Sequence, residues 1–394
     1  MQQTVPDYPA HAFAGEPAPL PGEPVARVRL PSGHEVWLVT GYEEVRAALT
    51  HPLLSREPVE GDPHVGSAGV PGGPNRAPRT LQKDGPAHAQ IRRLAARPFS
   101  ARRMESLRRR VQELTDGFLD TMEASGSPAD LIGALAYPLP ITVITELFAV
   151  PEEDREQFAL WSDRTVTLHG IERSQVQAAY AALQEYLGRL AEERRRSPGD
   201  DVLSGWLTAD EGGDRLTDGE VVRLAQTVLI GGYETTVNSI GAGMWRLFRN
   251  PDQLAALRAD PGLLRGTVEE ILRHQPQGLF FLIMVARGDL ELGGVTIRSG
   301  EGVMPLPFAA NRDPARFLDP GRFDIHRPPG GHITFGHGPH TCLGAALARI
   351  EVEVAIGTLN RRFPRLAPVD GDLAALPWRG DRLVSGLREL RVTW

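Results

Sequence analysis

The amino-acid sequence predicts one large, mainly helical domain that carries a small β region. Apolar residues recur with helical periodicity through most of the chain after Ala87, whereas β-like alternation is confined to short stretches. A chain of 394 residues can bury a large core. No internal repeat and no linker divides it into two cores. We therefore expect a proline-rich extension over residues 1–25 and a single domain over residues 26–394.

Local patterns predict the elements in order. Residues 26–39 alternate around a Pro-Ser-Gly turn, which predicts a β-hairpin, and residues 42–51 predict a short helix. Glycine and proline crowd residues 57–85, which predicts a long loop of the kind that is usually functional. Strand-like alternation returns over 283–304 and near 383–393, and residues 305–341 are mostly irregular. Helices are expected over residues 87–97, 102–123, 130–148, 152–168, 172–196, 217–248, 261–274 and 343–361.

Composition excludes several classes of protein. The net charge of −7 argues against general nucleic-acid binding. The first 25 residues hold six prolines and no long apolar run, so neither a secretory signal nor a membrane span is expected there or elsewhere. The hydrophobic share of 41% and the charged share of 24% are ordinary for a globular protein. We expect a cytoplasmic protein.

Cys342 is the only cysteine, which excludes an intrachain disulfide and a four-cysteine metal site. It could be an inert buried thiol, a nucleophile or a single thiolate ligand. Glycines around it let the backbone approach a flat ligand. The helix predicted after Gly344 places Cys342 just before a helix N-terminus, where free N–H groups stabilise a thiolate. The surroundings favour the ligand.

The run from Phe335 to Gly344 resembles the haem-ligand loop of the cytochrome P-450 family, whose pattern is Phe-x-x-Gly-x-Arg/His-x-Cys-x-Gly. The matching residues are Phe335, Gly338, His340, Cys342 and Gly344. The resemblance covers the chain from about residue 26 to its end. It implies a soluble bacterial haem-thiolate monooxygenase, with haem b (iron protoporphyrin IX) held by the Cys342 thiolate and a cytochrome P-450-type fold.

The helix predicted over 217–248 carries a second motif, Gly231-Gly232-Tyr233-Glu234-Thr235-Thr236. Two adjacent glycines cost about 1 kcal/mol each in a helix, which suggests a flat group against the backbone. The resemblance implies that Thr235 is the oxygen-activating alcohol and Glu234 its acidic, proton-supplying neighbour. The alternative is a kinked helix in which Thr235 hydrogen-bonds a backbone carbonyl.

Two further groups follow from the resemblance. Glu270 and Arg273 match its Glu-x-x-Arg motif, and with Arg322 of the segment Pro-Gly-Arg-Phe they would form a buried structural network. The plain alternative is an exposed i,i+3 ion pair. Donors to the haem propionates would be His88, Arg92 and His340, against a solvated helix face as the alternative. The family often has a further propionate-binding arginine where this chain has Met284.

The substrate pocket of this fold would be lined mainly by apolar residues, which suits a lipophilic or aromatic small organic molecule. Its candidate residues are Val228, Phe280, Phe281, Ile283, Met284 and Val384. Electrons would come from a ferredoxin and its reductase. An acidic ferredoxin would dock on a locally basic face, formed by Arg92, Arg93, Arg97, Arg102, Arg103, Arg108, Arg109, Arg110, Arg349, Arg361 and Arg362.

The sequence thus predicts a monooxygenase that activates O2 to hydroxylate or epoxidise a small molecule in secondary metabolism. One alternative is oxidative C–C or C–N coupling without oxygen insertion. Another is a non-catalytic binding or recruitment module with the same fold, against which the intact Cys342, Thr235 and Glu234 argue. A cysteine hydrolase is the third, but a histidine two residues from the cysteine is poorly placed as its base.

Overall fold

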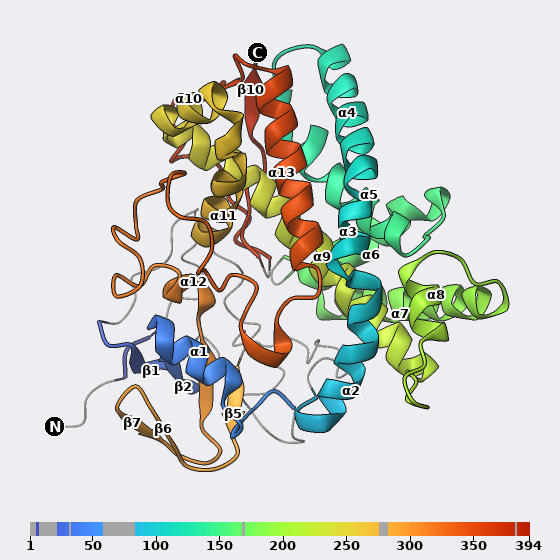
Figure 1. Cartoon of the computed structure of the whole chain (residues 1–394), viewed down its shortest axis with the longest axis vertical. Coiled ribbons are helices and arrows are strands. Elements are labelled where there is room, and N and C mark those ends of the chain that lie inside the picture. The colour runs from blue at the N-terminus through green and yellow to red at the C-terminus, as the bar shows by residue number, and fades with distance from the viewer. Residues whose placement is uncertain are drawn as a thin grey trace.

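The computed structural model describes residues 5–7, 22–30, 33–57, 83–167, 170–275, 283–382 and 384–394. Helices form the larger part of these residues, and most of the strands lie at the lower end of the molecule in Figure 1, whereas β10 (Arg391–Thr393) lies at the opposite end. The expectation of a mainly helical fold with a small β region is confirmed. No helix in the described part of the chain is both long and apolar enough to cross a membrane.

Thirteen α-helices are present in the described residues. They are α1 (Tyr42–Thr50), α2 (Gly85–Ala96), α3 (Ala101–Ser106), α4 (Arg108–Ser125), α5 (Pro138–Leu147), α6 (Arg155–Val166), α7 (Arg173–Arg196), α8 (Val202–Thr208), α9 (Asp218–Arg249), α10 (Pro251–Ala259), α11 (Leu264–His274), α12 (Pro307–Ala310) and α13 (Ala345–Arg362). Single turns of 3₁₀-helix cover Arg97–Phe99, Glu152–Asp154, Pro261–Leu263 and η5 (Gly338–His340), and a π-helical turn covers Ile132–Ala136.

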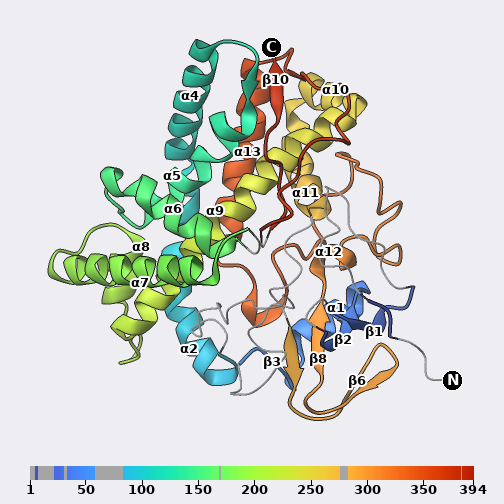
Figure 2. The same ribbon diagram turned by 180° about the vertical axis from the view of Figure 1, so that it is seen from behind.

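Helix α9 runs through the centre of the helical part, where α5, α7 and α13 pack against it (Figure 2). Its N-terminus has a capping box: Thr217 Oγ1 accepts from the N–H of Glu220, and the Glu220 carboxylate accepts from the N–H of Thr217. The apolar sides of these helices form one continuous core. A rigid, buried α9 can therefore hold its middle residues at a fixed position.

The β region is built on a five-stranded sheet in the order β1-β2-β8-β5-β3. The predicted hairpin is confirmed, because β1 and β2 pair antiparallel with Val25 opposite Val39. The other strands of the chain form a three-stranded sheet, β4-β10-β9, and a hairpin of β6 and β7. The strand bounds are β1 Val25–Arg29, β2 Glu35–Val39, β3 Leu54–Ser55, β4 Ala129–Asp130, β5 Met284–Ala286, β6 Leu290–Leu292, β7 Val295–Ile297, β8 Gly302–Pro305, β9 Ala367–Pro368 and β10 Arg391–Thr393.

Several element boundaries differ from the prediction. The helix expected over 102–123 is two helices that meet at Leu107, and the one expected over 130–148 is a π turn followed by α5. Pro138 lacks a backbone N–H, so a new helix begins there. The prediction lacks helices α8, α10 and the short α12. Asp201 caps α8 by accepting from the N–H of Ser204, and Pro251 opens α10. Most of the predicted loop 57–85 lies outside the described residues.

Candidate active site

The loop that carries Cys342 has a backbone course that only glycine allows at two points. Gly336 and Gly338 have φ angles of 79° and 75°, in the left-handed region. A Cβ atom on Gly338 would lie 2.5 Å from Cγ2 of Thr50, so the loop packs tightly against the end of α1. The N–H of Cys342 donates to the carbonyl of Phe335 at 2.8 Å. The loop is therefore held in one shape before α13 begins.

The surroundings of the Cys342 thiol suit a thiolate ligand. The Cys342 side chain is exposed although protein atoms surround it, as is expected of a side chain that lines an internal space. Burial raises the pKa of the thiol, while hydrogen bonds from the N–H groups of Gly344 and Ala345 and the charge of Arg92 act in the opposite direction. The first N–H groups of α13 thus point at the sulfur, as the sequence predicts.

Only one of the two glycines in the middle of α9 borders open space. Gly231 is accessible within a mostly buried helix, and a Cβ atom built on it would meet no atom within 4 Å. Gly232 instead faces α5, because its Cβ would lie 3.2 Å from Cδ1 of Ile144. Helix packing therefore accounts for Gly232, contrary to the prediction that both glycines face the cofactor. Gly231 leaves room for a flat group beside α9.

Glu234 is buried, 5% exposed, and it lies next to Thr235 in α9. Its Oε1 atom has no hydrogen-bond partner among the described residues. Burial raises the pKa of Glu234 to about 8, against the opposing charge of Arg382. Nη1 of Arg382 lies 3.8 Å from that oxygen, while its Nη2 donates to Oδ2 of Asp163 on α6 at 2.7 Å. The carboxyl of Glu234 therefore holds a proton near neutral pH.

Thr235 makes the local hydrogen bond that the sequence suggests as an alternative. Its Oγ1 donates to the carbonyl of Gly231 at 3.0 Å. A hydroxyl in such a bond still has acceptor capacity, and Thr235 is only partly buried. It can therefore accept a further hydrogen bond from the side of the open space while its own proton is held by the helix.

His88, Arg92 and His340 come together beside the cysteine loop, although they lie on α2 and η5. The His88 and His340 rings stack with centroids 3.8 Å apart, and Nη2 of Arg92 donates to the carbonyl of Thr341. The His88 side chain is 3% exposed, so the alternative that it lies on a solvated helix face is wrong. Its buried Nε2 has no partner within the described residues. An unpaired ring nitrogen beside an arginine fits a carboxylate acceptor, so these residues fit the propionates of haem.

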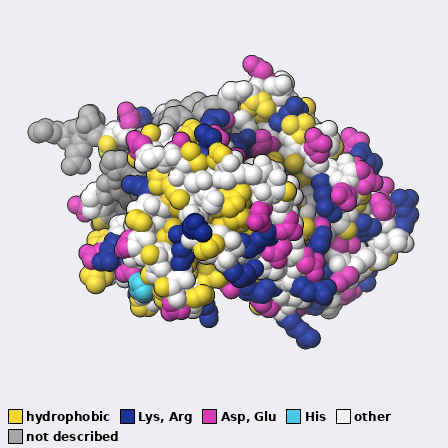
Figure 3. Space-filling view, turned by 90° about the horizontal axis from the view of Figure 1, so that it is seen from above, with side chains coloured by type: hydrophobic (Ala, Val, Ile, Leu, Met, Phe, Trp, Pro, Cys, Tyr) yellow, Lys and Arg dark blue, Asp and Glu magenta, His cyan; other side chains and the backbone are white. Residues whose placement is uncertain are grey.

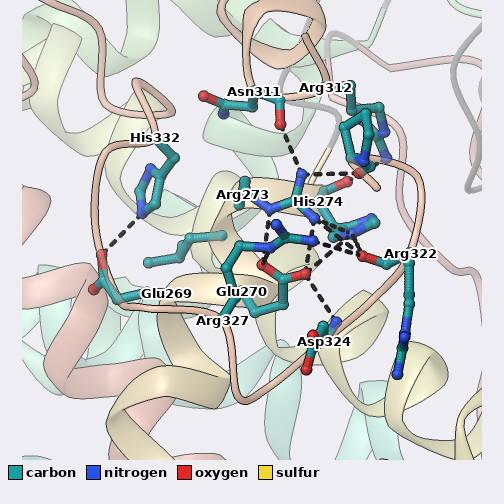
Figure 4. A network of polar contacts seen from close by, with 12 residues as sticks. Glu269, Glu270, Arg273, His274, Asn311, Arg312, Arg322, Asp324, Arg327 and His332 are labelled. Atoms are coloured by element: carbon teal, nitrogen blue, oxygen red, sulfur yellow. Dashed lines mark hydrogen bonds and ion pairs between the residues drawn. The ribbon is translucent and has the colours of Figure 1, made fainter. Parts of the chain in front are cut away.

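The predicted structural network exists, but Arg322 is not its third side chain (Figure 4). Glu270 and Arg273 are buried and joined by two hydrogen bonds of 2.7 and 2.8 Å. The Arg322 side chain is exposed and points away, and only its carbonyl accepts from Arg273, at 3.2 Å. The third cation is Arg327, whose Nε lies 3.3 Å from Oε2 of Glu270.

A turn explains this difference. The N–H of Arg322 donates to the carbonyl of Asp319 at 3.0 Å, so the chain reverses there and the side chain of Arg322 is turned outward. Five residues later, Arg327 returns to the buried carboxylate. His274 also joins, with Nε2 3.3 Å from Glu270. Burial opposes ionisation of Glu270, but the bonds from Arg273 and His274 outweigh it and lower its pKa to about 2.

A second buried network of ion pairs, called the Glu269 brace below, is centred on Glu269 of α11 and is not predicted by the sequence. Its carboxylate accepts from Nε2 of His332 at 2.9 Å and from Nε of Arg349 at 2.6 Å. Burial opposes ionisation, but these bonds lower the pKa of Glu269 to about 2. The guanidinium of Arg349 also lies over the ring of Phe335, 4.5 Å from its centroid. Glu269 therefore ties α11 both to the segment before the cysteine and to α13.

The pocket candidates are only partly placed. Val228 packs against the helical core, and Val384 is 2% exposed, with its carbonyl accepting from Nδ2 of Asn238 at 3.4 Å. Ile283 packs against the cluster around β8. Met284 is 3% exposed in the apolar cluster between α1 and the sheet. Phe280 and Phe281 lie outside the described residues, so the role of this set as pocket lining stays a prediction.

Many of the arginines assigned to a basic face are neutralised by neighbouring acids. Arg93 pairs with Asp214, Arg110 with Glu146, and Arg362 with Asp120. Basic and acidic side chains are accordingly intermixed over the surface in Figure 3. Arg109 differs, because its side chain is 90% exposed and its pair with Glu113 has a long distance of 3.5 Å. The basic face is therefore weaker than the sequence suggests.

Comparison with known proteins agrees with this site. The family model described as Cytochrome P450 matches residues 140–373. Cytochrome P450 monooxygenase PikC of Streptomyces venezuelae is 43% identical over 389 residues, 97% of this chain and 92% of that protein. Mycinamicin IV hydroxylase/epoxidase of Micromonospora griseorubida is 40% identical over 377 residues, 94% of this chain and 93% of that protein.

A solved structure agrees over almost the whole chain. The putative thioether synthase SgvP, described as involved in the tailoring step of griseoviridin, has a TM-score of 0.91 and 41% identity. The match covers 99% of this chain and 100% of that one. Together with the cysteine loop, the Glu234–Thr235 pair and the cluster of His88, Arg92 and His340, these similarities show that the chain belongs to the cytochrome P450 family of haem-dependent monooxygenases.

Proposed function

We propose that this cytochrome P450 hydroxylates or epoxidises a lipophilic or aromatic small molecule in the secondary metabolism of an actinomycete. The observation that carries the proposal is the accessible Cys342 thiol at the start of α13, with the open space beside Gly231 on α9. Cys342 would hold the haem iron, and His88, Arg92 and His340 would hold the propionates. Haem ligated by a thiolate supplies O2 activation, because the sulfur donates electron density to the iron.

The chain's own part in the reaction is proton delivery. Glu234 carries a proton near pH 7, because burial raises its pKa to about 8. Thr235 beside it presents a hydroxyl oxygen that can accept a hydrogen bond. Asp163, which binds Arg382, also lines a groove of about 700 Å³ on the surface between α5 and α6. We propose that protons from solvent reach Glu234 through this groove and past the Asp163–Arg382 pair, in which the Arg382 guanidinium orients the two carboxyl groups and keeps its own protons.

Relatives support the class of substrate. One is named a hydroxylase/epoxidase for mycinamicin IV, and another carries the name PikC monooxygenase. The candidate lining residues of this chain, Val228, Ile283 and Val384 among them, are apolar. An apolar pocket with few polar groups favours a hydrophobic ligand and leaves its orientation to a small number of hydrogen bonds.

A coupling reaction is the second candidate. A solved relative described as cytochrome P450mel 107F1 with biaryl coupling reactivity has a TM-score of 0.89 and 36% identity over 98% of this chain. The same fold with a similar sequence therefore occurs with a reaction that joins two aryl groups. In such a reaction the product would lose two hydrogens and gain no oxygen.

Electrons would come from a ferredoxin and its reductase. The exposed Arg109 on α4 is the best placed of the predicted docking residues, since Arg110 is bound to Glu146 by two hydrogen bonds of 2.9 and 3.0 Å. Long-range attraction by such exposed charges accelerates association and weakens with salt.

Substrate screening followed by mass analysis tests the proposal. Purified enzyme is titrated with lipophilic and aromatic compounds, and those that shift the ferric haem to high spin are turned over with ferredoxin and reductase under ¹⁸O2. A product heavier by one ¹⁸O atom supports oxygen insertion. A product lighter by two hydrogens, with no label, replaces it with the coupling reaction. Charged metabolites as the only spin-shifting compounds would contradict the substrate class.

A further inference from the structure

Arg56 follows β3 and has no partner for part of its guanidinium. Its Nε is buried without a hydrogen bond to any described residue, and burial lowers the pKa of Arg56 to about 10, despite the nearby charge of Asp84. The residue is nevertheless partly accessible. The Arg56 side chain is therefore largely removed from water without being sealed in the core. A buried cation of this kind needs an anion.

The carboxylate of Asp84, whose charge acts on Arg56, is used by other groups. Its carboxylate accepts from Oγ of Ser55 at 2.5 Å and from the backbone N–H of Arg56 at 3.2 Å. Its Oδ1 also lies 3.9 Å from Nε2 of His340. The contact of Asp84 with Arg56 therefore involves the backbone, and among the described residues no carboxylate is hydrogen-bonded to the Arg56 guanidinium.

The neighbours of Arg56 are the predicted propionate donors. Burial, followed by the positive charges of Arg92 and Arg56, lowers the pKa of His88, so both arginines lie near that histidine. His88 in turn stacks on His340. Four cationic or hydrogen-donating side chains, Arg56, His88, Arg92 and His340, therefore lie near one another, and Arg56 and His88 each have a buried nitrogen without a partner among the described residues. Two carboxylates would provide more acceptors for the hydrogen bonds and charges of these side chains than one.

The strand register links Arg56 to Met284. Strand β3 pairs antiparallel with β5, with Leu54 opposite Ala286 and Ser55 opposite Val285. The next step of this register places Arg56 opposite Met284. Residues directly opposite in an antiparallel pair project from the same face of the sheet, about 5 Å apart. A guanidinium at position 56 can therefore reach the region that an arginine at position 284 would occupy.

We infer that Arg56 is a propionate-binding residue of this enzyme and that it takes the place of the arginine that position 284 lacks. The positive charge comes from the neighbouring strand instead of from β5. The inference rests on haem binding alone, so it is independent of the substrate and of the redox partner proposed above.

The rate of haem loss tests the inference. Ferric holoenzyme is mixed with excess apomyoglobin, and transfer of haem is followed by absorbance for the wild type, Arg56→Met and Arg93→Met. Methionine keeps the backbone N–H that binds Asp84. Arg93 is the control, because it lies on α2 but pairs with Asp214 on the surface. Haem loss should be about tenfold faster in Arg56→Met only, since a charged hydrogen bond to a carboxylate is lost. A wild-type rate in Arg56→Met overturns the inference.

A second cofactor separates direct contact from loosening of the fold. The wild type and Arg56→Met are each reconstituted with the dimethyl ester of haem, which has no carboxylate charge. If Arg56 binds a propionate, the wild type and Arg56→Met lose the ester at nearly equal rates. A tenfold difference that persists with the ester overturns the inference. The double variant Arg56→Met/Met284→Arg should regain slow loss of native haem, and failure to do so would overturn the cross-strand replacement.

Discussion

Nη1 of Arg382 lies 3.8 Å from Oε1 of Glu234, although the two residues are far apart in the sequence. The same guanidinium is bound by Asp163 of α6, so its charge is shared between the carboxyl groups of Asp163 and Glu234. Burial raises the pKa of Glu234 and the charge of Arg382 lowers it. Asp163 thus helps to keep the Glu234 carboxyl protonated by occupying Arg382.

Replacing Asp163 should change the pH dependence of turnover. In Asp163→Asn, Arg382 is free to pair with Glu234, so the pKa of Glu234 falls from about 8 toward its ordinary value of 4.5. If the protonated form is needed, activity on the alkaline side should be lost at a lower pH than in the wild type. Turnover profiles from pH 6 to pH 9, measured with spin-state titrations as a control for binding, would reveal this. If turnover of the wild type and of Asp163→Asn falls at the same alkaline pH, the proposed route of protons to Glu234 is wrong.

Glu234→Gln should lower turnover about 100-fold or more, because a glutamine cannot release a proton. Substrate affinity, measured by the shift to high spin, should stay within about twofold. The solvent deuterium isotope effect on turnover should rise at the same time. Full activity in this variant would exclude Glu234 as the proton donor.

Arg327→Ala should yield little holoprotein, whereas Arg322→Ala should behave as the wild type. Removal of Arg327 leaves part of a buried carboxylate charge unpaired, at a cost of about 3–5 kcal/mol. Arg322 contributes a carbonyl, which alanine retains. The matched pair is compared by haem content per protein and by the urea midpoint. Equal behaviour of the two variants would contradict the network seen in Figure 4.

Acid should release the Glu269 brace within a defined range. The pKa of Glu269 is lowered from 4.5 to about 2, so the folded state binds fewer protons than the unfolded state between these values. The stability that this group contributes is present above pH 4.5 and is lost as the pH falls toward 2. In Glu269→Gln, the urea midpoint at pH 7 should be lower and should depend less on acid. If the urea midpoint of Glu269→Gln falls as steeply between pH 5 and pH 3 as that of the wild type, the stabilising role of the Glu269 brace is contradicted.

Cys342→Ser should keep the fold and lose the spectrum of a thiolate ligand. The reduced, CO-bound difference spectrum reports the ligand on the opposite side of the iron. The variant should therefore lack the band typical of thiolate ligation while far-ultraviolet circular dichroism is unchanged. A wild-type band in the variant would show that Cys342 is not the ligand.

Charge reversal at Arg109 should weaken the reaction with ferredoxin. Arg109→Glu is expected to raise the apparent KM for ferredoxin about threefold to tenfold at low salt, with less effect at high salt, because exposed charges act through long-range attraction. Arg46→Glu on α1 is the control for a change in net charge. An equal effect of both substitutions, or none, would reject a docking role for Arg109.

Much of the fold and of the reacting centre follows from contiguous patterns. The Thr217–Glu220 capping box, the hairpin of β1 and β2 and the glycine loop before α13 each depend on residues within about a dozen positions. Backbone geometry within one turn or one hairpin decides such contacts, so local spacing predicts them. The break at Leu107 and the start of α10 show that boundaries remain less certain, since neighbouring helices determine them.

The sequence by itself determined the chemistry of this protein: a single thiolate at a helix start and an acid–alcohol pair beside a glycine in a long helix. Only the tertiary structure decided which distant side chains lie beside these groups: Arg327 in place of Arg322 at Glu270, and Arg382 and Asp163 beside Glu234. The reason is physical. A turn that reverses the chain, or one step of strand register, determines where a long side chain reaches, and neither leaves a local periodicity in the sequence.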